Sequence, residues 1–154
     1  MAKKAIVMGA TSGIGMEVAK LLAAKGWQVG IAGRRIERLQ ALISQSGITS
    51  YQQIDVTSHD APVQLLELIE KLGGMDLYFH SSGIGWQNNS LDIEKEMKTL
   101  ETNGLGFTRM VDTAFNWFAT HHHCNPKARI ACITSIAGTK GLGAAPAYSA
   151  TKRF

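Results

Sequence analysis

Short runs of apolar residues alternate with longer amphipathic segments along the whole chain. Apolar runs of four to six residues are typical of strands, and apolar residues at helical spacing are typical of helices that cover a sheet. The predicted strands are residues 4–8, 28–32, 50–54, 76–80 and 129–134. The predicted helices are residues 13–25, 35–45, 60–72 (capped by Ser58), 91–122 (two helices meeting near Asn103 and Gly104) and a last one from Pro146.

This alternation predicts an α/β fold, because parallel strands need crossover helices that pack on both faces of the sheet. We predict one Rossmann-type domain over residues 1–154, with a doubly wound parallel sheet in the order 3-2-1-4-5. In such sheets the ligand lies at the carboxyl ends of the strands, beside the first strand. The notable residue groups of the chain follow those ends: Gly9–Gly15, Gly33–Arg34, Asp55–Val56, Ser81–Gly83 and Ser135.

A turn of small residues connects the first strand to the first helix. Backbone N–H groups at a helix N-terminus attract anions, and glycines let a pyrophosphate approach the backbone closely. The residues expected to bind a dinucleotide here are Gly9, Thr11, Ser12, Gly13, Ile14 and Gly15. Small residues after a strand also form ordinary turns, so this motif alone leaves both interpretations open.

The ends of the second and third strands carry charged residues. No carboxylate ends the second strand, and Arg34 there would accommodate a 2′-phosphate, which favours NADP(H) over NAD(H). The alternative is that Arg34 and Arg35 begin a solvated helix. Asp55 and Val56 end the third strand, where a carboxylate can accept a hydrogen bond from an adenine amino group; a turn that begins a helix is the alternative.

Tyr148 and Lys152 are four residues apart and therefore share one face of the last predicted helix. A tyrosine hydroxyl has a pKa of about 10, and a nearby ammonium group stabilises the phenolate. Such a pair can donate a proton to a carbonyl oxygen, which Ser135 could also hydrogen-bond. An exposed helix pair is the alternative for Tyr148 and Lys152 alone, but Ser135 and the glycine turn favour catalysis.

Together these motifs resemble the short-chain dehydrogenase/reductase family over all 154 residues. The resemblance implies that Tyr148 is the general acid/base, that Ser135 polarises the substrate oxygen, and that Lys152 assists Tyr148 and holds the nicotinamide ribose. It implies that Asn103 supports a proton-relay water. Ser82 and Gly83 belong to a segment, residues 80–83, that lies where the family usually has Asn-Asn-Ala-Gly, and they are expected to contact the cofactor.

Three features depart from the family pattern. Met8 replaces a threonine before the first glycine, and Ser81 and Ser82 replace Asn and Ala. The chain also ends just after Lys152, where the family continues with further strands and a substrate-covering segment. We therefore expect a domain truncated at its C-terminus, with residues 130–133 as an apolar edge strand of the kind that is buried on both faces.

Composition narrows the classes of protein further. With 45% hydrophobic and 18% charged residues, the chain is an ordinary globular sequence. The net charge of +4 is spread thinly, so no nucleic-acid partner is expected, and no apolar run is long enough for a membrane helix. Two cysteines, Cys124 and Cys132, fit a reduced, cytoplasmic setting. We expect no metal site, because the consecutive residues His121, His122 and His123 point in different directions on a helix.

The sequence thus predicts an oxidoreductase that transfers a hydride between NADP(H) and a small-molecule carbonyl/alcohol substrate, as a homo-oligomer (dimer or tetramer) when full length. A non-catalytic NADP-binding regulator and an inactive fragment of a longer reductase are the alternatives. Trp86, in the loop after the fourth strand, contacts either the substrate or the core; the sequence leaves both interpretations open.

Overall fold

The computed structural model describes residues 1–44, 47–121 and 126–154. Its strands form a single parallel sheet in the order β3-β2-β1-β4-β5, which confirms the predicted order. The strands are β1 (Lys4–Met8), β2 (Gln28–Gly33), β3 (Ile48–Gln53), β4 (Leu77–His80) and β5 (Arg129–Cys132). Because β1 lies at the centre, the chain crosses from one half of the sheet to the other between β3 and β4.

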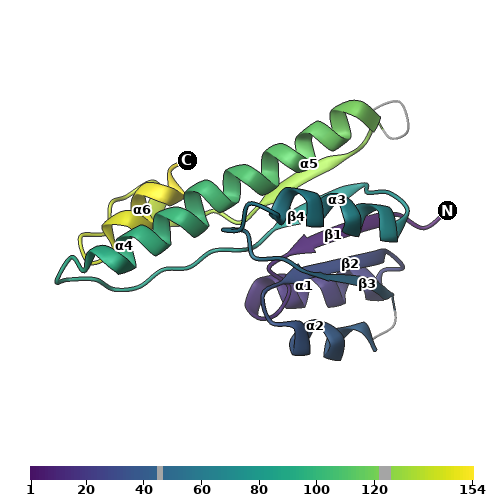
Figure 1. The fold of residues 1–154 in the computed structure, drawn as a ribbon, viewed down its shortest axis with the longest axis horizontal. Helices are drawn as coiled ribbons and strands as arrows, with labels where there is room; N and C mark the ends of the chain where they lie inside the picture. Colours follow the sequence, from purple (N-terminus) through teal and green to yellow (C-terminus); the bar gives the residue numbers. More distant parts are fainter. Residues whose placement is uncertain (45–46, 122–125) are drawn as a thin grey trace.

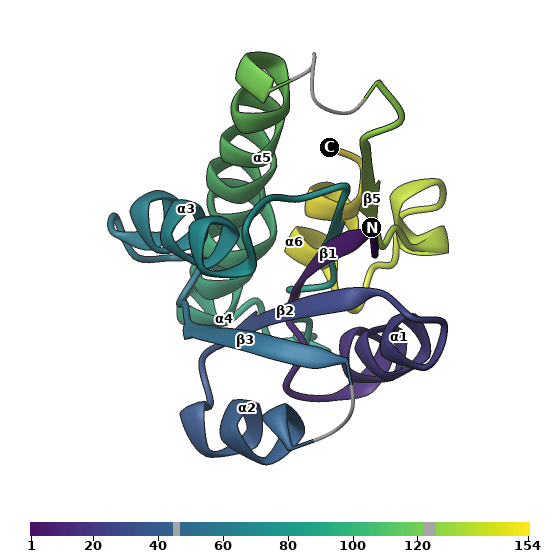
Figure 2. The same ribbon diagram turned by 90° about the vertical axis from the view of Figure 1, so that its right-hand side faces the viewer.

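Helices cover both faces of this sheet. In Figure 1, α1 and α2 lie below the strands and α3 and α5 lie above them, and Figure 2 shows the same layers from the side. The helices are α1 (Gly13–Ala24), α2 (Ile36–Ile43), α3 (Ala61–Leu72), α4 (Ile93–Leu100), the π-helical η1 (Glu101–Gly106), α5 (Phe107–His121), the 3₁₀ turn η3 (Ile136–Gly138) and α6 (Pro146–Lys152).

The core divides into two clusters, one on each face of the sheet. Side chains of β1 alternate between them: Ile6 and Met8 pack with α3 and α5, whereas Val7 packs with α1 and α2. All three are fully buried. A central strand of a parallel sheet is covered on both faces, which is why β1 is apolar at consecutive positions.

One local prediction was wrong. Ser58 does not cap α3; Asp60 is the residue before the helix, and the Ser58 hydroxyl accepts a hydrogen bond from the Asp60 N–H at 3.2 Å within the preceding turn. The predicted junction of two helices near Asn103 and Gly104 is confirmed: both residues lie in η1, which joins α4 to α5 in one continuous helical rod. Buried packing of both residues in η1 outweighs their low helix propensity. Gln45 and His122, the predicted ends of two helices, lie outside the described residues.

Strand β5 lies at the edge of the sheet, as expected, since it pairs with β4 on one side only. Its side chains Ile130, Ala131 and Cys132 are half-buried rather than buried. An apolar strand of a kind that is elsewhere buried on both faces thus lies at the sheet edge, as predicted. One-sided pairing leaves these apolar side chains partly open to solvent.

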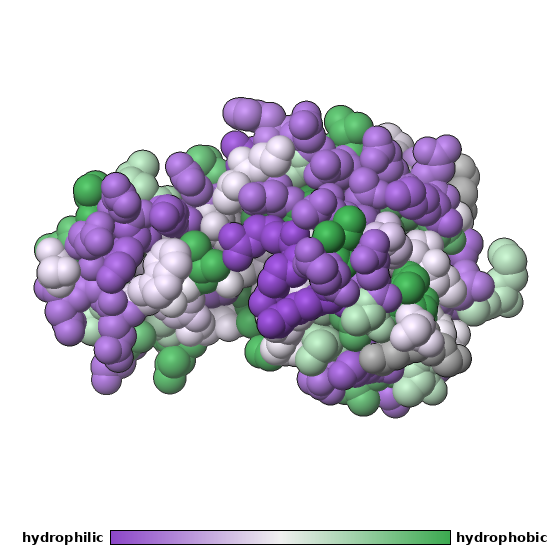
Figure 3. All heavy atoms as spheres, turned by 60° about the horizontal axis from the view of Figure 1, so that its bottom comes forward, coloured by the Kyte–Doolittle hydropathy of each residue, from purple (hydrophilic) through white to green (hydrophobic). Residues whose placement is uncertain are grey.

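Figure 3 shows one face of the molecule, on which hydrophilic side chains predominate and apolar ones are scattered. The rod from α4 to α5 exposes large apolar side chains, namely Ile93, Met97, Leu105 and Phe115. Within the described ranges, no helix combines the length and the apolar character that a membrane crossing requires.

Leu68 offers a test of the core on the α3 face of the sheet. It is fully buried, whereas Leu66 on the same helix is 43% exposed. We expect Leu68→Ala to lower the free energy of unfolding by about 2–5 kcal/mol, because the substitution leaves a cavity. Leu66→Ala, the matched control, should cost about 1 kcal/mol or less. Urea unfolding followed by circular dichroism measures both; equal costs would contradict the described packing of α3.

Candidate active site

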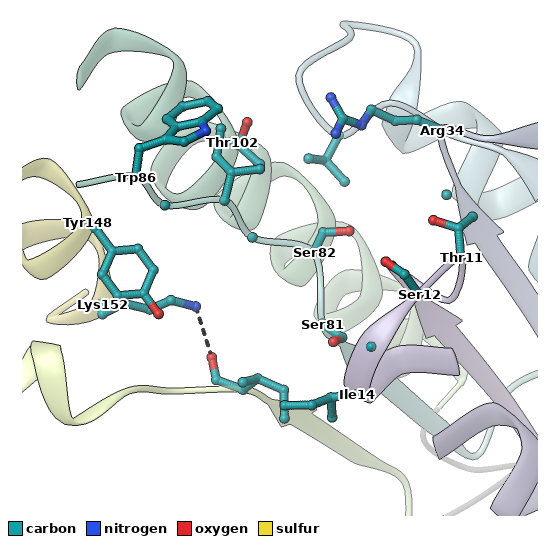
Figure 4. A pocket seen from close by; sticks show the side chains of 18 of the residues that line it. Thr11, Ser12, Ile14, Arg34, Ser81, Ser82, Trp86, Thr102, Tyr148 and Lys152 are labelled. Carbon is teal, nitrogen blue, oxygen red and sulfur yellow. Dashed lines mark hydrogen bonds between the residues drawn. The ribbon is translucent and has the colours of Figure 1, made fainter. Parts of the chain in front are cut away.

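A cavity of about 590 Å³ opens at the carboxyl ends of the strands. It lies between the turn after β1, the loop after β4 and helix α6, as Figure 4 shows. Most residues proposed from the sequence line it: Gly9, Thr11, Ser12, Gly13, Ile14, Arg34, Asp55, Val56, Ser82, Gly83, Tyr148 and Lys152. Gly15, Asn103 and Ser135 do not belong to its lining.

The turn after β1 has the geometry of an anion site. Gly9 has φ +85°, and a Cβ there would lie 2.7 Å from the backbone N of Ser82, so only glycine fits. A Cβ on Gly13 would have no described atom within 4 Å, which leaves the start of α1 open toward the cavity. The Ser12 side chain does not cap α1. The first N–H groups of α1 therefore remain available for a phosphate, and the residues fit a dinucleotide.

Gly15, in the first turn of α1, packs against the backbone of the same turn. A Cβ at this position would lie 2.2 Å from the carbonyl oxygen of Gly9, so α1 packs directly on the turn. The glycine is required for this close approach of helix and turn rather than for a wall of the cavity.

Arg35 contacts the turn after β1, a contact that the sequence did not predict. Its Nη2 donates to the hydroxyl oxygens of Thr11 and Ser12, both at 2.8 Å, and its Nε donates to Thr11 at 3.2 Å. Arg34 lines the cavity beside it. Two guanidinium groups therefore lie at this edge of the cavity. The Arg35 group is revealed only by the tertiary structure, in which the turn after β1 lies close to the end of β2.

Asp55 forms the turn before α3, one of the two roles that the sequence left open, and its side chain also lies at the cavity. Its Oδ1 accepts hydrogen bonds from the N–H and the hydroxyl of Thr57, at 2.9 and 2.7 Å, which forms the turn before α3. Asp55 also lines the cavity. Partial burial raises the pKa of this carboxyl, but the bonds from Thr57 and the charge of Arg34 outweigh burial, so the pKa is lowered. The group is therefore an ionised acceptor at neutral pH.

Helix α6 brings Tyr148 and Lys152 to the cavity wall, and both are half-buried. The Lys152 amine lies 5.7 Å from the centre of the Tyr148 ring and donates to the carbonyl of Ile133 at 3.4 Å. Figure 4 shows both polar groups pointing into the cavity. A hydroxyl and an ammonium group thus face the same space as the anion-binding turn.

The loop after β4 packs against the catalytic candidate. A Cβ on Gly85 would lie 2.5 Å from Cδ2 of Tyr148, so the Gly85 backbone lies flat against the ring. The next residue, Trp86, is 43% exposed and lines the cavity, which excludes its alternative role as a cover for the core. No sequence signal singles out Gly85, because its role comes from a contact between distant segments.

Asn103 connects three segments around the site. Its Oδ1 accepts from the N–H of Ile84 at 2.8 Å, and its Nδ2 donates to the Ile84 carbonyl at 2.7 Å and to the Thr151 hydroxyl at 3.2 Å. The side chain therefore joins η1, the loop after β4 and α6. Ser135 has a different contact: its hydroxyl accepts from the Ala137 N–H at 3.2 Å and caps η3.

Behind the cavity, β4 ends in two buried polar side chains. Tyr78 is fully buried and His80 is 3% exposed, and the Tyr78 hydroxyl lies 2.8 Å from Nδ1 of His80. Burial lowers the pKa of His80 to about 4, an effect that a backbone hydrogen bond with Ser82 opposes and the charge of Lys152 reinforces. The imidazole is therefore neutral at physiological pH.

No metal centre is evident in the parts of the chain that the structure describes, where no three His, Cys, Asp or Glu residues come together. His122 and His123, two of the three consecutive histidines, lie outside the described residues. His121 donates to or accepts from groups of its own helix and stacks on Trp117 at 4.1 Å between ring centres.

Comparisons with known proteins identify the family of the chain. The family model described as short chain dehydrogenase matches residues 3–154, so the chain belongs to the short-chain dehydrogenase family. An uncharacterized oxidoreductase of Myxococcus xanthus is 31% identical over 159 residues, with 99% of this chain and 61% of that protein covered. One from Listeria monocytogenes is 32% identical, with 97% and 62% covered. This chain thus spans about three fifths of the length of the curated relatives it matches.

Solved structures show the same fold. A variant of actinorhodin polyketide ketoreductase with NADPH matches with a TM-score of 0.85 and 28% identity, over 99% of this chain and 60% of that one. A short chain dehydrogenase from Mycobacterium smegmatis matches with a TM-score of 0.89 at 24% identity, over 99% and 66%. These matches agree with the sheet order and helix layers described above.

The depressed pKa of His80 predicts a pH effect on stability. The ordinary histidine pKa of about 6.5 applies to the unfolded chain, so protons bind the unfolded state first as pH falls. Stability should therefore be fully present above about pH 6.5 and decrease as pH falls toward the folded value of about 4. NMR titration of the His80 ring measures that value, and urea unfolding at several pH values measures the effect. Titration of the ring near 6.5 would contradict its described burial.

Proposed function

We propose that this chain is the cofactor-binding and proton-donating part of a reductase that transfers a hydride between NADP(H) and the carbonyl or alcohol of a small molecule. The observation that carries the proposal is the shared cavity. The anion-binding turn of Gly9–Gly15 and the pair Tyr148 and Lys152 face the same space, although more than a hundred residues of sequence separate them. A residue set of this kind suits proton transfer next to a bound dinucleotide.

Each part of the cavity has a proposed role in holding the cofactor. The N-terminus of α1 binds the pyrophosphate, Arg34 and Arg35 bind the 2′-phosphate, and Asp55 accepts from the adenine amino group, with Val56 beside it. Ser82, Gly83 and Lys152 surround the nicotinamide end. Support comes from the related ketoreductase, whose solved structure contains NADPH. The bound cofactor supplies the hydride chemistry.

The chain itself supplies the proton and the orientation of the substrate. Tyr148 donates the proton to the carbonyl oxygen as general acid and removes it in the reverse direction as base. Lys152 stabilises the negative charge that develops on the Tyr148 oxygen. Asn103 fixes the loop that carries Ile84 against α6, and thereby the Gly85 backbone against the Tyr148 ring. Ser135 hydrogen-bonds the substrate oxygen once its hydroxyl leaves the cap of η3.

The contact of Ser135 also supports a second candidate function, NADP(H) binding without turnover. Its hydroxyl is engaged with the Ala137 N–H, and Ser135 lies outside the cavity lining. A binding protein would need the turn and the arginines but no proton donor. The two candidates differ in what the loss of the Tyr148 hydroxyl would do.

Because the chain spans about three fifths of its relatives, the substrate and the assembly are proposals for the whole protein. We propose residues 1–154 as a single NADP-binding domain and a homo-oligomer as the assembled form. The exposed apolar side chains of the α4 to α5 rod support the oligomer, since a partner subunit could remove them from water.

Cofactor preference provides the first test. A charge-assisted contact contributes about 1.5–3 kcal/mol, so NADPH should bind at least about tenfold more tightly than NADH. Arg34→Ala should remove most of that difference, and Arg35→Ala should reduce it while disturbing Thr11 and Ser12. Lys20→Ala, which removes a charge paired with Glu17 on α1, is the control and should leave the preference unchanged. Calorimetry measures the dissociation constants of NADPH and NADH for each variant. Equal affinities for the two cofactors in the unmutated protein would refute the 2′-phosphate assignment.

Loss of the Tyr148 hydroxyl provides the second test. A panel of aldehydes and ketones, followed by NADPH absorbance, first identifies a substrate that the protein reduces. Tyr148→Phe should then lower turnover by roughly 10²–10⁴ and leave NADPH affinity nearly unchanged, because the ring remains. Lys152→Ala should impair both quantities. Near-normal turnover by Tyr148→Phe would exclude Tyr148 as the acid, and NADPH binding with no reduction of any carbonyl would favour the binding protein.

A further inference from the structure

The buried pair at the end of β4 has an unused hydrogen-bonding group. Tyr78 and His80 are two residues apart on a strand, so their side chains lie on the same face of the sheet. The His80 ring packs edge-on against Phe107 of α5, with 5.2 Å between ring centres. Its Nδ1 pairs with the Tyr78 hydroxyl, whereas its Nε2 is buried and has no hydrogen-bond partner among the described residues.

The protonation of the pair follows from its burial. Burial raises the pKa of Tyr78 well above its usual value and lowers that of His80 to about 4, so both groups are neutral at pH 7. Within the described part of the chain, His80 is the sole hydrogen-bond partner of the Tyr78 hydroxyl. The hydroxyl therefore donates to Nδ1, and the hydrogen of the neutral ring is on Nε2.

This places a buried N–H donor next to the cofactor loop. Buried donors in folded proteins nearly always find an acceptor, because an unpaired one is unfavourable. One candidate acceptor is the backbone of Ser82, two residues further along the chain, because a backbone hydrogen bond with Ser82 raises the pKa of His80. Ser82 lines the cavity, so a small shift of this loop would complete the bond.

The surroundings of the ring favour this neutral donor. The titratable groups near it include Tyr78 on β4, Cys132 on β5 and Lys152 on α6; burial raises the pKa of Cys132, and the positive charge of Lys152 helps to lower the pKa of His80. Hydrogen bonds through the backbone also connect His80 to Lys152. The His80 carbonyl accepts from the Ile133 N–H at 3.1 Å, and the Ile133 carbonyl accepts from Lys152 at 3.4 Å.

We propose that His80 is a positioning residue whose Nε2–H donates to the Ser82 carbonyl, directly or through one water, when a dinucleotide occupies the cavity. The bond holds Ser82 and Gly83 in the conformation that contacts the cofactor, and the Tyr78 hydroxyl holds the ring in the required tautomer. The inference rests on the proposed function only in that the dinucleotide binds in this cavity.

The ring itself gives a direct measurement. In ¹⁵N-labelled protein at pH 7, NMR should show the neutral Nε2–H tautomer of His80. Addition of NADPH should slow the exchange of this hydrogen with water, since the bond to Ser82 closes. An Nδ1–H tautomer, or an exchange rate that NADPH leaves unchanged, would overturn the proposal.

Two amide substitutions distinguish the role of Nε2 of His80 from that of Nδ1. His80→Gln places an amide N–H near the position of Nε2, whereas His80→Asn reaches only the position of Nδ1 and keeps the contact with Tyr78. We expect NADPH affinity within about threefold of the unmutated protein for His80→Gln, and about tenfold weaker for His80→Asn and His80→Leu. A residue that only pairs with Tyr78 would give the reverse order of the two amides, and that result would overturn the proposal.

Controls distinguish a failure of the His80 proposal from a failure of the proposed function. Circular dichroism verifies folding of each variant; if His80→Leu does not fold, the two amide variants and the NMR measurement decide. The proposed chemistry fails if Tyr148→Phe retains turnover, which leaves the binding results for His80 intact. The His80 proposal fails if all three variants bind NADPH like the unmutated protein, whatever their turnover.

Discussion

The site depends on the close approach of two backbones, that of Gly9 after β1 and that of Ser82 after β4. A Cβ on Gly9 would lie 2.7 Å from the Ser82 nitrogen, so any other residue would separate the two segments. Their contact sets where the N-terminus of α1 points and where the loop carrying Gly83 and Gly85 runs. The uncapped N-terminus of α1 and the wall of the cavity therefore share one steric requirement.

The half of the cavity that Tyr148 and Lys152 line is held by a second set of contacts, which involve distant parts of the chain. Asn103 joins η1 to the Ile84 backbone and to Thr151, and Glu96 accepts from the Ala147 N–H at 2.8 Å. These bonds fix α6, a helix too short to be stable by itself, against the α4 to α5 rod. Tyr148 and Lys152 thereby face the turn after β1.

The charges of the cavity are arranged along its length. Arg34 and Arg35 lie at one end, the ammonium group of Lys152 lies at the other, and the uncapped start of α1 lies between them. His80 stays neutral behind Lys152, because burial and the neighbouring positive charge both disfavour its protonation. An extended ligand with several phosphates matches this pattern better than a small neutral one.

Periodicity and turn composition determined the parallel sheet, the helix layers and most of the cavity lining, because the ends of parallel strands meet at one edge whatever their side chains. The sequence did not reveal Arg35 on Thr11, Gly85 on the Tyr148 ring, or the buried donor of His80. It placed the junction of two helices near Asn103 and Gly104, but it did not reveal the π-helical form of that junction. Each of these depends on contacts between segments far apart in the chain. Local propensity and spacing carry no information about such contacts, and only tertiary packing decides them.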